Sequence, residues 1–178
     1  MESEDKTVGV VTDRVAEMTC SECHQLIDVS EVQPFARIEC PNCDAEQTVP
    51  ARLGSFLLLD LIGTGGMGGV YYAKDETLGR FVAIKVMLSS LGETEELVST
   101  FRSEAQAVAK LNHPHIAQIY SFGQEKGQPY IVMELVSGSR LDDMIDQDSP
   151  LDQGFVVNTI VEIAEGLEAA SDVDLVHG

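Results

Sequence analysis

The chain has 178 residues, and its 30 Asp and Glu residues against 11 Lys and Arg give a formal net charge of −19. Because each phosphate contact with a polyanion needs a Lys or Arg, nucleic acid and anionic membrane surfaces are poor candidate partners. Hydrophobic residues make up 44% of the sequence, which excludes disorder throughout and supplies material for a core. The length suits one domain or two small ones.

Residues 1–16 are polar and acidic, and we expect them to form a flexible tail. The start, Met-Glu-Ser-Glu-Asp, lacks both the basic and the apolar stretch of a secretory signal. No apolar run approaches the ~20 residues that span a bilayer. We therefore expect a cytoplasmic location, with a membrane helix beyond residue 178 left open.

Four cysteines follow in two C-x2-C pairs, Cys20 with Cys23 and Cys40 with Cys43. This spacing lets both thiolates of a tight turn reach one ion, and two such turns facing each other form a tetrahedral four-sulfur site. Zinc is the leading metal because thiolates are soft ligands, and iron is the main competitor. Disulfides or a redox pair are the alternatives. Four thiolates leave no open coordination position, so the pattern predicts a structural site.

Residues 17–48 are predicted to form a small zinc ribbon around these cysteines. Its expected short strands are Leu26–Val29 and Phe35–Ile38. A unit of this size buries too little surface to fold alone, so the metal would supply much of its folding energy. The acidic composition favours protein contact over nucleic-acid binding. Residues 49–55, which contain a proline and a glycine, are predicted to be a linker.

The rest of the chain has the pattern of a mixed domain with several strands and two long helices. The expected strands are Phe56–Ile62, Val70–Lys74, Phe81–Leu88, Ile116–Phe122 and Pro129–Leu135. One helix is expected to begin after the N-cap Thr94 and to end near Asn112. A second long helix is expected over Asp152–Ala170.

A glycine-rich turn lies between the first two of these strands. Gly63, Gly65 and Gly68 form the pattern G-x-G-x-x-G, which lets backbone N–H groups approach phosphates. A turn without function, a Rossmann turn and a P-loop are the other interpretations. The next residues, Val-Tyr-Tyr-Ala, favour a strand over the helix of a Rossmann turn, and no Gly-Lys-Ser/Thr of a P-loop is present. The pattern therefore predicts a strand–loop–strand clamp over a nucleotide.

Lys85 ends the run Val-Ala-Ile-Lys in a predicted strand, on the same face as Ala83. A lysine among apolar residues should be partly buried, and its ammonium group then needs an anionic partner. Glu104 is the candidate, because it projects near the apolar face of the first long helix. The residues alone leave open a purely structural ion pair, or pairing of Glu104 with Arg102 or Lys110 on its own helix.

From Phe56 onward the chain resembles the protein kinase family, especially bacterial serine/threonine kinases of the eukaryotic type. The segments that carry the resemblance occur in kinase order: Ile-Gly-Thr-Gly-Gly-Met-Gly-Gly-Val-Tyr, Val-Ala-Ile-Lys, Phe-Arg-Ser-Glu-Ala, Leu-Asn-His-Pro-His-Ile and Tyr-Ile-Val-Met-Glu-Leu-Val. The resemblance implies an α+β fold. Residues 56–136 would form a kinase N-lobe, with a five-stranded antiparallel sheet and one helix, and residues 137–178 the first helices of a C-lobe.

The resemblance also implies a nucleotide site, with the glycine-rich loop over the phosphates of ATP. Lys85 would hold the α- and β-phosphates and pair with Glu104 as part of the catalytic machinery. Met133 would be the gatekeeper, and backbone groups of Glu134 and Val136 would hydrogen-bond the adenine edge. The implied ATP-binding residues are Ile62, Gly63, Gly65, Gly66, Gly68, Val70, Ala83, Lys85, Met133, Glu134 and Val136.

The implied function is phosphoryl transfer from ATP to protein hydroxyl groups, with ATP and magnesium as cofactors and zinc as a structural metal. The catalytic Asp and the magnesium ligands of the pattern would follow Gly178, so we expect these 178 residues to be an inactive fragment. The second long helix would then expose an apolar face. The alternative is a pseudokinase, or a nucleotide-binding or protein-interaction module whose ribbon contacts other proteins.

Overall fold

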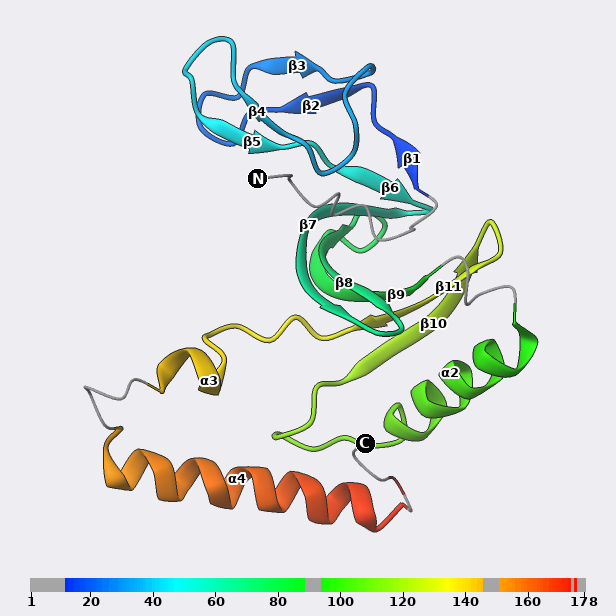
Figure 1. The fold of residues 1–178 in the computed structure, drawn as a ribbon, viewed down its shortest axis with the longest axis vertical. Coiled ribbons are helices and arrows are strands. Elements are labelled where there is room, and N and C mark those ends of the chain that lie inside the picture. The colour runs from blue at the N-terminus through cyan, green and yellow to red at the C-terminus, as the bar shows by residue number, and fades with distance from the viewer. Residues whose placement is uncertain (1–11, 89–93, 146–150, 174, 176–178) are drawn as a thin grey trace.

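The computed structural model describes residues 12–88, 94–145, 151–173 and 175 of the chain. Along its longest axis lie a small module of short strands, a large antiparallel sheet with helix α2 (Glu95–Val108) beside it, and helix α4 (Gln153–Ser171) (Figure 1). This is the predicted α+β architecture.

Two antiparallel hairpins form the N-terminal module. They are β2 (Glu17–Thr19) with β3 (Leu26–Asp28), and β4 (Arg37–Glu39) with β5 (Glu46–Thr48). Each hairpin carries one C-x2-C pair at its turn, as predicted. The strand expected at Phe35–Ile38 is wrong at its start, because Phe35 has a φ of 62° and leaves the extended conformation.

The large sheet has the strand order β1-β6-β7-β8-β9-β11-β10. The five consecutive strands from β7 to β10 in this order correspond to the predicted ones. They are β7 (Phe56–Gly65), β8 (Gly68–Asp75), β9 (Arg80–Met87), β11 (Gln128–Met133) and β10 (Ile119–Glu125). Alternate residues of these strands point to opposite faces. On one face lies the main core, which includes Leu58, Tyr71, Val82, Ile84 and Val132.

Two further strands extend this sheet and correct two predictions. β6 (Ala51–Leu53) lies in the stretch predicted as a linker, and it pairs with β7. Ala51 and Leu53 are fully buried, and their alternation with Arg52 explains why this short segment forms a strand. β1 (Asp13–Arg14) lies in the predicted flexible tail and pairs with β6. Residues 1–11 of that tail are outside the described residues.

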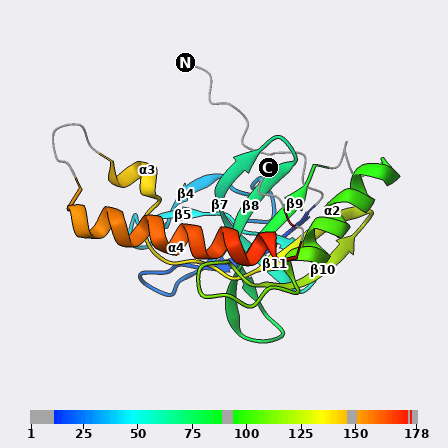
Figure 2. The same ribbon diagram turned by 90° about the horizontal axis from the view of Figure 1, so that it is seen from below.

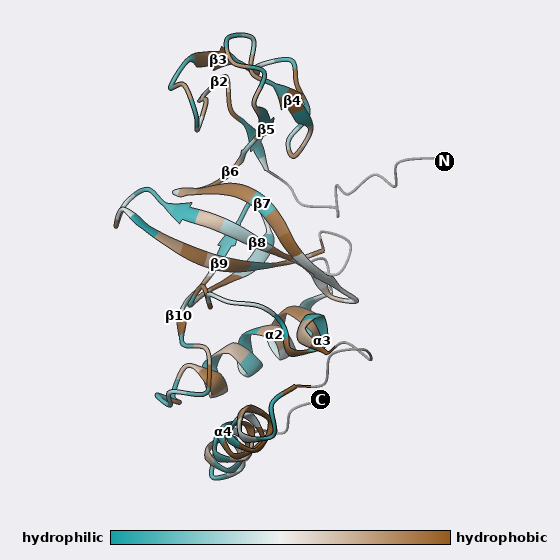
Figure 3. Ribbon diagram, turned by 90° about the vertical axis from the view of Figure 1, so that its left-hand side faces the viewer, coloured by the Kyte–Doolittle hydropathy of each residue, from teal (hydrophilic) through white to brown (hydrophobic). Residues whose placement is uncertain are grey.

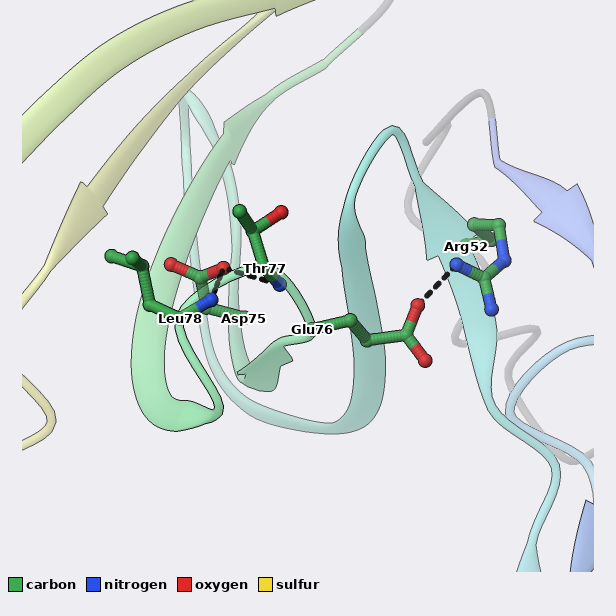
Figure 4. A network of polar contacts seen from close by, with 5 residues as sticks. All are labelled: Arg52, Asp75, Glu76, Thr77 and Leu78. Atoms are coloured by element: carbon green, nitrogen blue, oxygen red, sulfur yellow. Dashed lines mark hydrogen bonds and ion pairs between the residues drawn. The ribbon is translucent and has the colours of Figure 1, made fainter.

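An ion pair joins β6 to the turn between β8 and β9 (Figure 4). In this turn the buried carboxylate of Asp75 accepts hydrogen bonds from the backbone N–H groups of Thr77 and Leu78, both at 3.1 Å. The neighbouring carboxylate of Glu76 accepts from the guanidinium group of Arg52 on β6. The segment predicted to be a linker is therefore attached to the sheet by side-chain contacts as well as by backbone pairing.

Helix α2 packs on the sheet through Phe101 and Ala105, which form a second core with Met87 and Ile131. Thr94 is its N-cap residue, as predicted. The helix ends at Val108, four residues before the predicted end, because the backbone then forms a tighter turn with a hydrogen bond from the Leu111 N–H to the Val108 carbonyl at 2.9 Å.

Helices α3 (Leu141–Met144) and α4 follow the sheet, and α4 lies outside it (Figures 1 and 2). The side chain of Asp152 caps α4 by accepting from the Phe155 N–H at 3.0 Å. The apolar residues Ile160, Ile163 and Leu167 of α4 are 60%, 48% and 50% exposed, as predicted. Figure 3 shows α4 at the end of the molecule away from the N-terminal module, with hydrophobic stretches along the helix. No helix in the described ranges is long and apolar enough to cross a membrane.

Candidate nucleotide site and metal centre

The strand register brings the predicted nucleotide-binding residues onto one face of the sheet. Lys85 on β9 lies directly opposite Val70 on β8 and Ile131 on β11. Two residues earlier, Ala83 lies opposite Met133 on β11. Directly opposed residues share a face, so these side chains line one contiguous surface. It is the face opposite the main core, since the buried residues of that core alternate with them along the strands.

The glycine-rich segment is the closed end of the β7–β8 hairpin, which confirms the strand–loop–strand prediction. Pairing continues to Gly65 opposite Gly68. The Leu88 N–H donates to the Met67 carbonyl at 2.9 Å, which fixes the tip of the hairpin to the end of β9. Gly68 has a φ of 150°, and a Cβ there would lie 1.9 Å from the Val86 carbonyl oxygen. Position 68 therefore requires glycine.

Two positions of the hairpin leave its backbone accessible. A Cβ added at Gly65 or Gly66 would meet no atom within 4 Å. Ile62, just before the glycines, is 51% exposed. The space beside these two glycines is therefore free of other atoms, so a ligand can approach the backbone there without a clash.

Lys85 is half-buried, as predicted, but its predicted partner lies elsewhere. Glu104 is exposed, and none of the ion pairs between described residues joins it to Lys85. Phe101 and Ala105 occupy the positions of α2 that face the sheet, and the Lys85 Nζ lies 5.7 Å from the centroid of the Phe101 ring. Water solvates an exposed carboxylate well, so little energy favours an ion pair here.

The predicted hinge continues from β11 as an open segment. The Glu134 N–H donates to the Gln118 carbonyl at 2.8 Å, and the Glu134 carboxylate accepts from the Gln118 N–H at 3.0 Å. These bonds hold the start of the hinge against the residue that directly precedes β10. Val136 is 69% exposed, and its backbone has no hydrogen-bond partner among the described residues. That backbone is therefore available to a ligand.

The four cysteines converge as predicted. Their sulfur atoms all lie within 4.8 Å of one another. The Cys20 and Cys43 sulfurs are 3.7 Å apart, and those of Cys23 and Cys40 are 3.6 Å apart. A tetrahedron with metal–sulfur bonds of about 2.3 Å has edges of about 3.8 Å, so the sulfur positions fit a four-coordinate thiophilic ion.

The two cysteine turns repeat the same backbone geometry. His24 follows the second cysteine of the first pair with a φ of 59°, and Asp44 follows that of the second pair with a φ of 58°. In each turn the N–H of that residue donates to the carbonyl of the first cysteine, at 3.1 Å for His24 and 2.9 Å for Asp44. This repeated turn points both thiols of each pair toward the same centre.

Two of the cysteine thiols, those of Cys23 and Cys43, have strongly shifted pKa values. Hydrogen bonds from the Asn42 side chain and the Gln25 backbone lower the pKa of Cys23 to about 6. A backbone hydrogen bond from Ala45 acts in the same direction on Cys43, but the adjacent Cys23 sulfur and burial outweigh it and raise the pKa of Cys43 to about 12. At Cys43 the closeness of the other sulfurs matters, because a thiolate on one sulfur disfavours a thiolate on the next. A bound cation would remove that repulsion.

The chain belongs to the protein kinase domain family, which matches residues 56–178. It is 38% identical over 124 residues to the serine/threonine-protein kinase PrkC of Bacillus subtilis (strain 168). It is 37% identical over 129 residues to the serine/threonine-protein kinase PknA of Mycobacterium tuberculosis (strain ATCC 25618 / H37Rv). These matches cover 70% of this chain, but only 19% of PrkC and 30% of PknA.

A solved structure shows the same fold. The kinase domain of PknI from Mycobacterium tuberculosis, in a double-mutant form, matches with a TM-score of 0.61 and 25% identity. The match covers 70% of this chain and 52% of that chain. The kinase-like N-lobe predicted from the sequence is therefore confirmed, and the sheet carries β1 and β6 in addition.

Two residues near the site were missed by the sequence reasoning. Tyr71, beside Val70, is fully buried under the glycine-rich hairpin, and Phe35 of the N-terminal module stacks on it. Strand alternation places Tyr71 on the face opposite Val70, which is a readable signal. Phe35 is the only aromatic residue of the predicted ribbon, but nothing in its local sequence indicates where its ring packs.

Proposed function

We propose that this chain supplies the ATP-binding part of a protein serine/threonine kinase, which transfers the γ-phosphoryl group of ATP to protein hydroxyl groups. The observation that supports it most is the register of Lys85 directly between Val70 and Ile131, on strand β9 beside a hairpin in which Gly65 and Gly66 have open space next to them. In the kinase pattern a lysine at this position binds the α- and β-phosphates, and the glycine-rich loop covers them.

Each group of the site would have its own part in binding ATP. The Lys85 ammonium would neutralise and orient the phosphates, and magnesium bound with ATP would supply further positive charge. Ala83 and Met133 would form apolar walls for the adenine, while the unbonded backbone of Val136 would meet its polar edge.

ATP binding to the chain tests this proposal directly. Lys85→Ala removes a charge-assisted contact, so ATP affinity should fall about ten- to hundredfold in a calorimetric titration. Lys74→Ala is the matched control, because Lys74 is an exposed lysine on the neighbouring strand β8. Equal ATP affinity in wild type and Lys85→Ala would refute the assignment of Lys85.

The second candidate function is a nucleotide-binding module without phosphoryl transfer. The observation that favours it is the exposed Glu104, which leaves Lys85 without the carboxylate that active kinases place beside it. Transfer of labelled γ-phosphate from ATP to peptides with Ser, Thr or Tyr separates the two functions for the whole protein. Transfer to Ser and Thr supports the kinase, whereas Lys85-dependent ATP binding without transfer supports the alternative.

We also propose that Cys20, Cys23, Cys40 and Cys43 hold structural zinc, and that the ribbon contacts other proteins. The fit of the sulfur positions to a tetrahedral thiolate site supports zinc. Metal analysis of the purified chain should give one zinc per chain, whereas iron as the bound metal would contradict the proposal. The cytoplasmic location predicted from the sequence stays a prediction.

A further inference from the structure

The N-terminal module contacts the sheet beside the glycine-rich hairpin, on the face opposite to Lys85. The ring of Phe35 stacks on the ring of Tyr71, with centroids 5.2 Å apart and planes at 29°. Phe35 is half-buried in this contact and packs against the main core of the sheet. An aromatic pair of this geometry contributes beyond the area that it buries.

Phe35 is held in place by the backbone that leads into the sheet. Its N–H donates to the Val49 carbonyl at 2.7 Å, and the Val49 N–H donates to the Ala36 carbonyl at 2.9 Å. Val49 is buried and lies two residues before β6. The φ of 62° is unfavourable for a bulky side chain, so the surrounding contacts must hold the turn that presents this ring.

Tyr71 in turn packs against the backbone of the glycine-rich hairpin. A Cβ added at Gly69 would lie 3.0 Å from Cε2 and 3.1 Å from Oη of Tyr71, and 3.0 Å from Cδ1 of Leu61. The Tyr71 ring therefore occupies the space that a side chain at position 69 would fill. It supports the hairpin from the face opposite to Val70 and Lys85.

The Tyr71 hydroxyl does not explain why a tyrosine lies here. It is buried and has no hydrogen-bond partner in the described part of the chain, and this burial raises its pKa to about 12. An unpaired buried hydroxyl disfavours folding. The favourable contribution of this residue must therefore come from its ring, which is the part that touches both Phe35 and Gly69.

We propose that Phe35 is a positioning residue for nucleotide binding, which acts through the ring of Tyr71 to hold the glycine-rich hairpin over the phosphates of ATP. This inference rests on the proposed ATP-binding function. It gives the N-terminal module a role in the nucleotide site that the kinase family match, which begins at residue 56, does not contain. The module then supports the hairpin from the face opposite to Val70 and Lys85.

The test compares ATP with adenosine as ligands of the 178-residue chain. The hairpin covers the phosphates, so Phe35→Ala should weaken ATP binding about three- to tenfold and leave adenosine binding nearly unchanged. Phe35→Tyr, which keeps the ring, should restore ATP affinity. Leu26→Ala is the matched control, because Leu26 is a 54% exposed apolar residue of the same module.

Two outcomes would overturn the inference: unchanged ATP affinity in Phe35→Ala, or equal weakening of ATP and adenosine binding, which indicates general loosening of the lobe. If the alanine variant does not fold, the same comparison is made with Phe35→Leu, which keeps an apolar side chain but loses the stacking. Lys85→Ala, titrated in parallel, distinguishes the two proposals. ATP binding that ignores both Lys85 and Phe35 refutes the proposed function, whereas binding that needs Lys85 but ignores Phe35 refutes only this inference.

Discussion

The N-terminal module and the sheet lobe are held together by different interactions. The module has four short hairpin strands and a small core in which two of the buried residues are cysteines, Cys20 and Cys40. The lobe has a continuous antiparallel sheet with aliphatic and aromatic residues buried on its core face. With the proposed zinc bound, we expect the module to depend on its sulfur cluster, whereas the lobe depends on apolar burial.

The two regions nevertheless share a boundary that is itself structured. β6 is a strand of the sheet, and Val49 just before it belongs to the core of the module. Ion pairs of Arg52 with Glu76, and of Lys126 with Asp13, attach the boundary strands β6 and β1 to the rest of the sheet. The experiments below ask whether the regions unfold separately or together, in order of decreasing expected effect.

The largest effect should come from loss of one cysteine ligand. Cys40→Ser removes one of four sulfurs, and a structural zinc site contributes on the order of 10 kcal/mol to folding. We expect loss of bound metal and of hydrogen-exchange protection in β2 to β5, while β8 and β9 stay protected. Metal analysis and hydrogen exchange monitored by mass spectrometry measure both results.

The matched control for this experiment is His24→Asn. His24 directly follows a cysteine ligand but is not one of the four convergent residues, and Asn tolerates its φ of 59°. This variant should keep the metal. If β8 and β9 lose protection together with the module in Cys40→Ser, the two regions form one cooperative unit. That result would contradict the view that different interactions hold the module and the lobe together.

A smaller effect, confined to the lobe, is expected from Leu58→Ala. Leu58 is fully buried in the main core, so the cavity should lower the free energy of unfolding by about 3 kcal/mol in urea denaturation. The same substitution at Leu78, which is 64% exposed, should cost less than about 0.5 kcal/mol. Both variants should keep their metal, and metal loss in Leu58→Ala would again mean that the regions fold as one unit.

The sequence predicted most of this architecture because its signals are local. Strand alternation located the five strands that carry the site, and the C-x2-C spacing located the sulfur cluster. The order of the motifs also agrees with the structure, in which Lys85 and Val70 share one face of the sheet and the glycines close the β7–β8 hairpin. Each of these features is determined by neighbours within a few residues.

What failed depends on contacts between distant segments. Pro50 and Gly54 favour a linker locally, but the burial of Ala51 and Leu53 under the sheet makes the segment a strand. The position of Glu104 depends on which residues of α2 the sheet buries, and helix spacing alone does not decide that. The stacking of Phe35 on Tyr71 joins segments that are 36 positions apart, and no local pattern encodes it.

The smallest effect is expected at the boundary itself, from Tyr71→Phe. This change keeps the ring that touches Phe35 and removes a buried hydroxyl without a partner among the described residues, so the free energy of unfolding should rise by about 1 kcal/mol near pH 8. Tyr120→Phe is the matched control, because Tyr120 is 42% exposed. Urea denaturation of both variants measures the difference, and destabilisation by Tyr71→Phe would mean that the hydroxyl is bonded.

The pH dependence gives a second, independent test of the same residue. Burial raises the pKa of Tyr71 to about 12, whereas an unfolded tyrosine titrates near about 10. Between these values the unfolded chain releases the proton and the folded chain keeps it. The contribution of Tyr71 to stability is therefore fully present below about pH 10 and is lost as the pH rises toward 12. Tyr71→Phe should lose this part of the alkaline decline and Tyr120→Phe should retain it. An identical decline in all three proteins would place the Tyr71 hydroxyl in water, and the boundary between module and lobe would then be open and not packed.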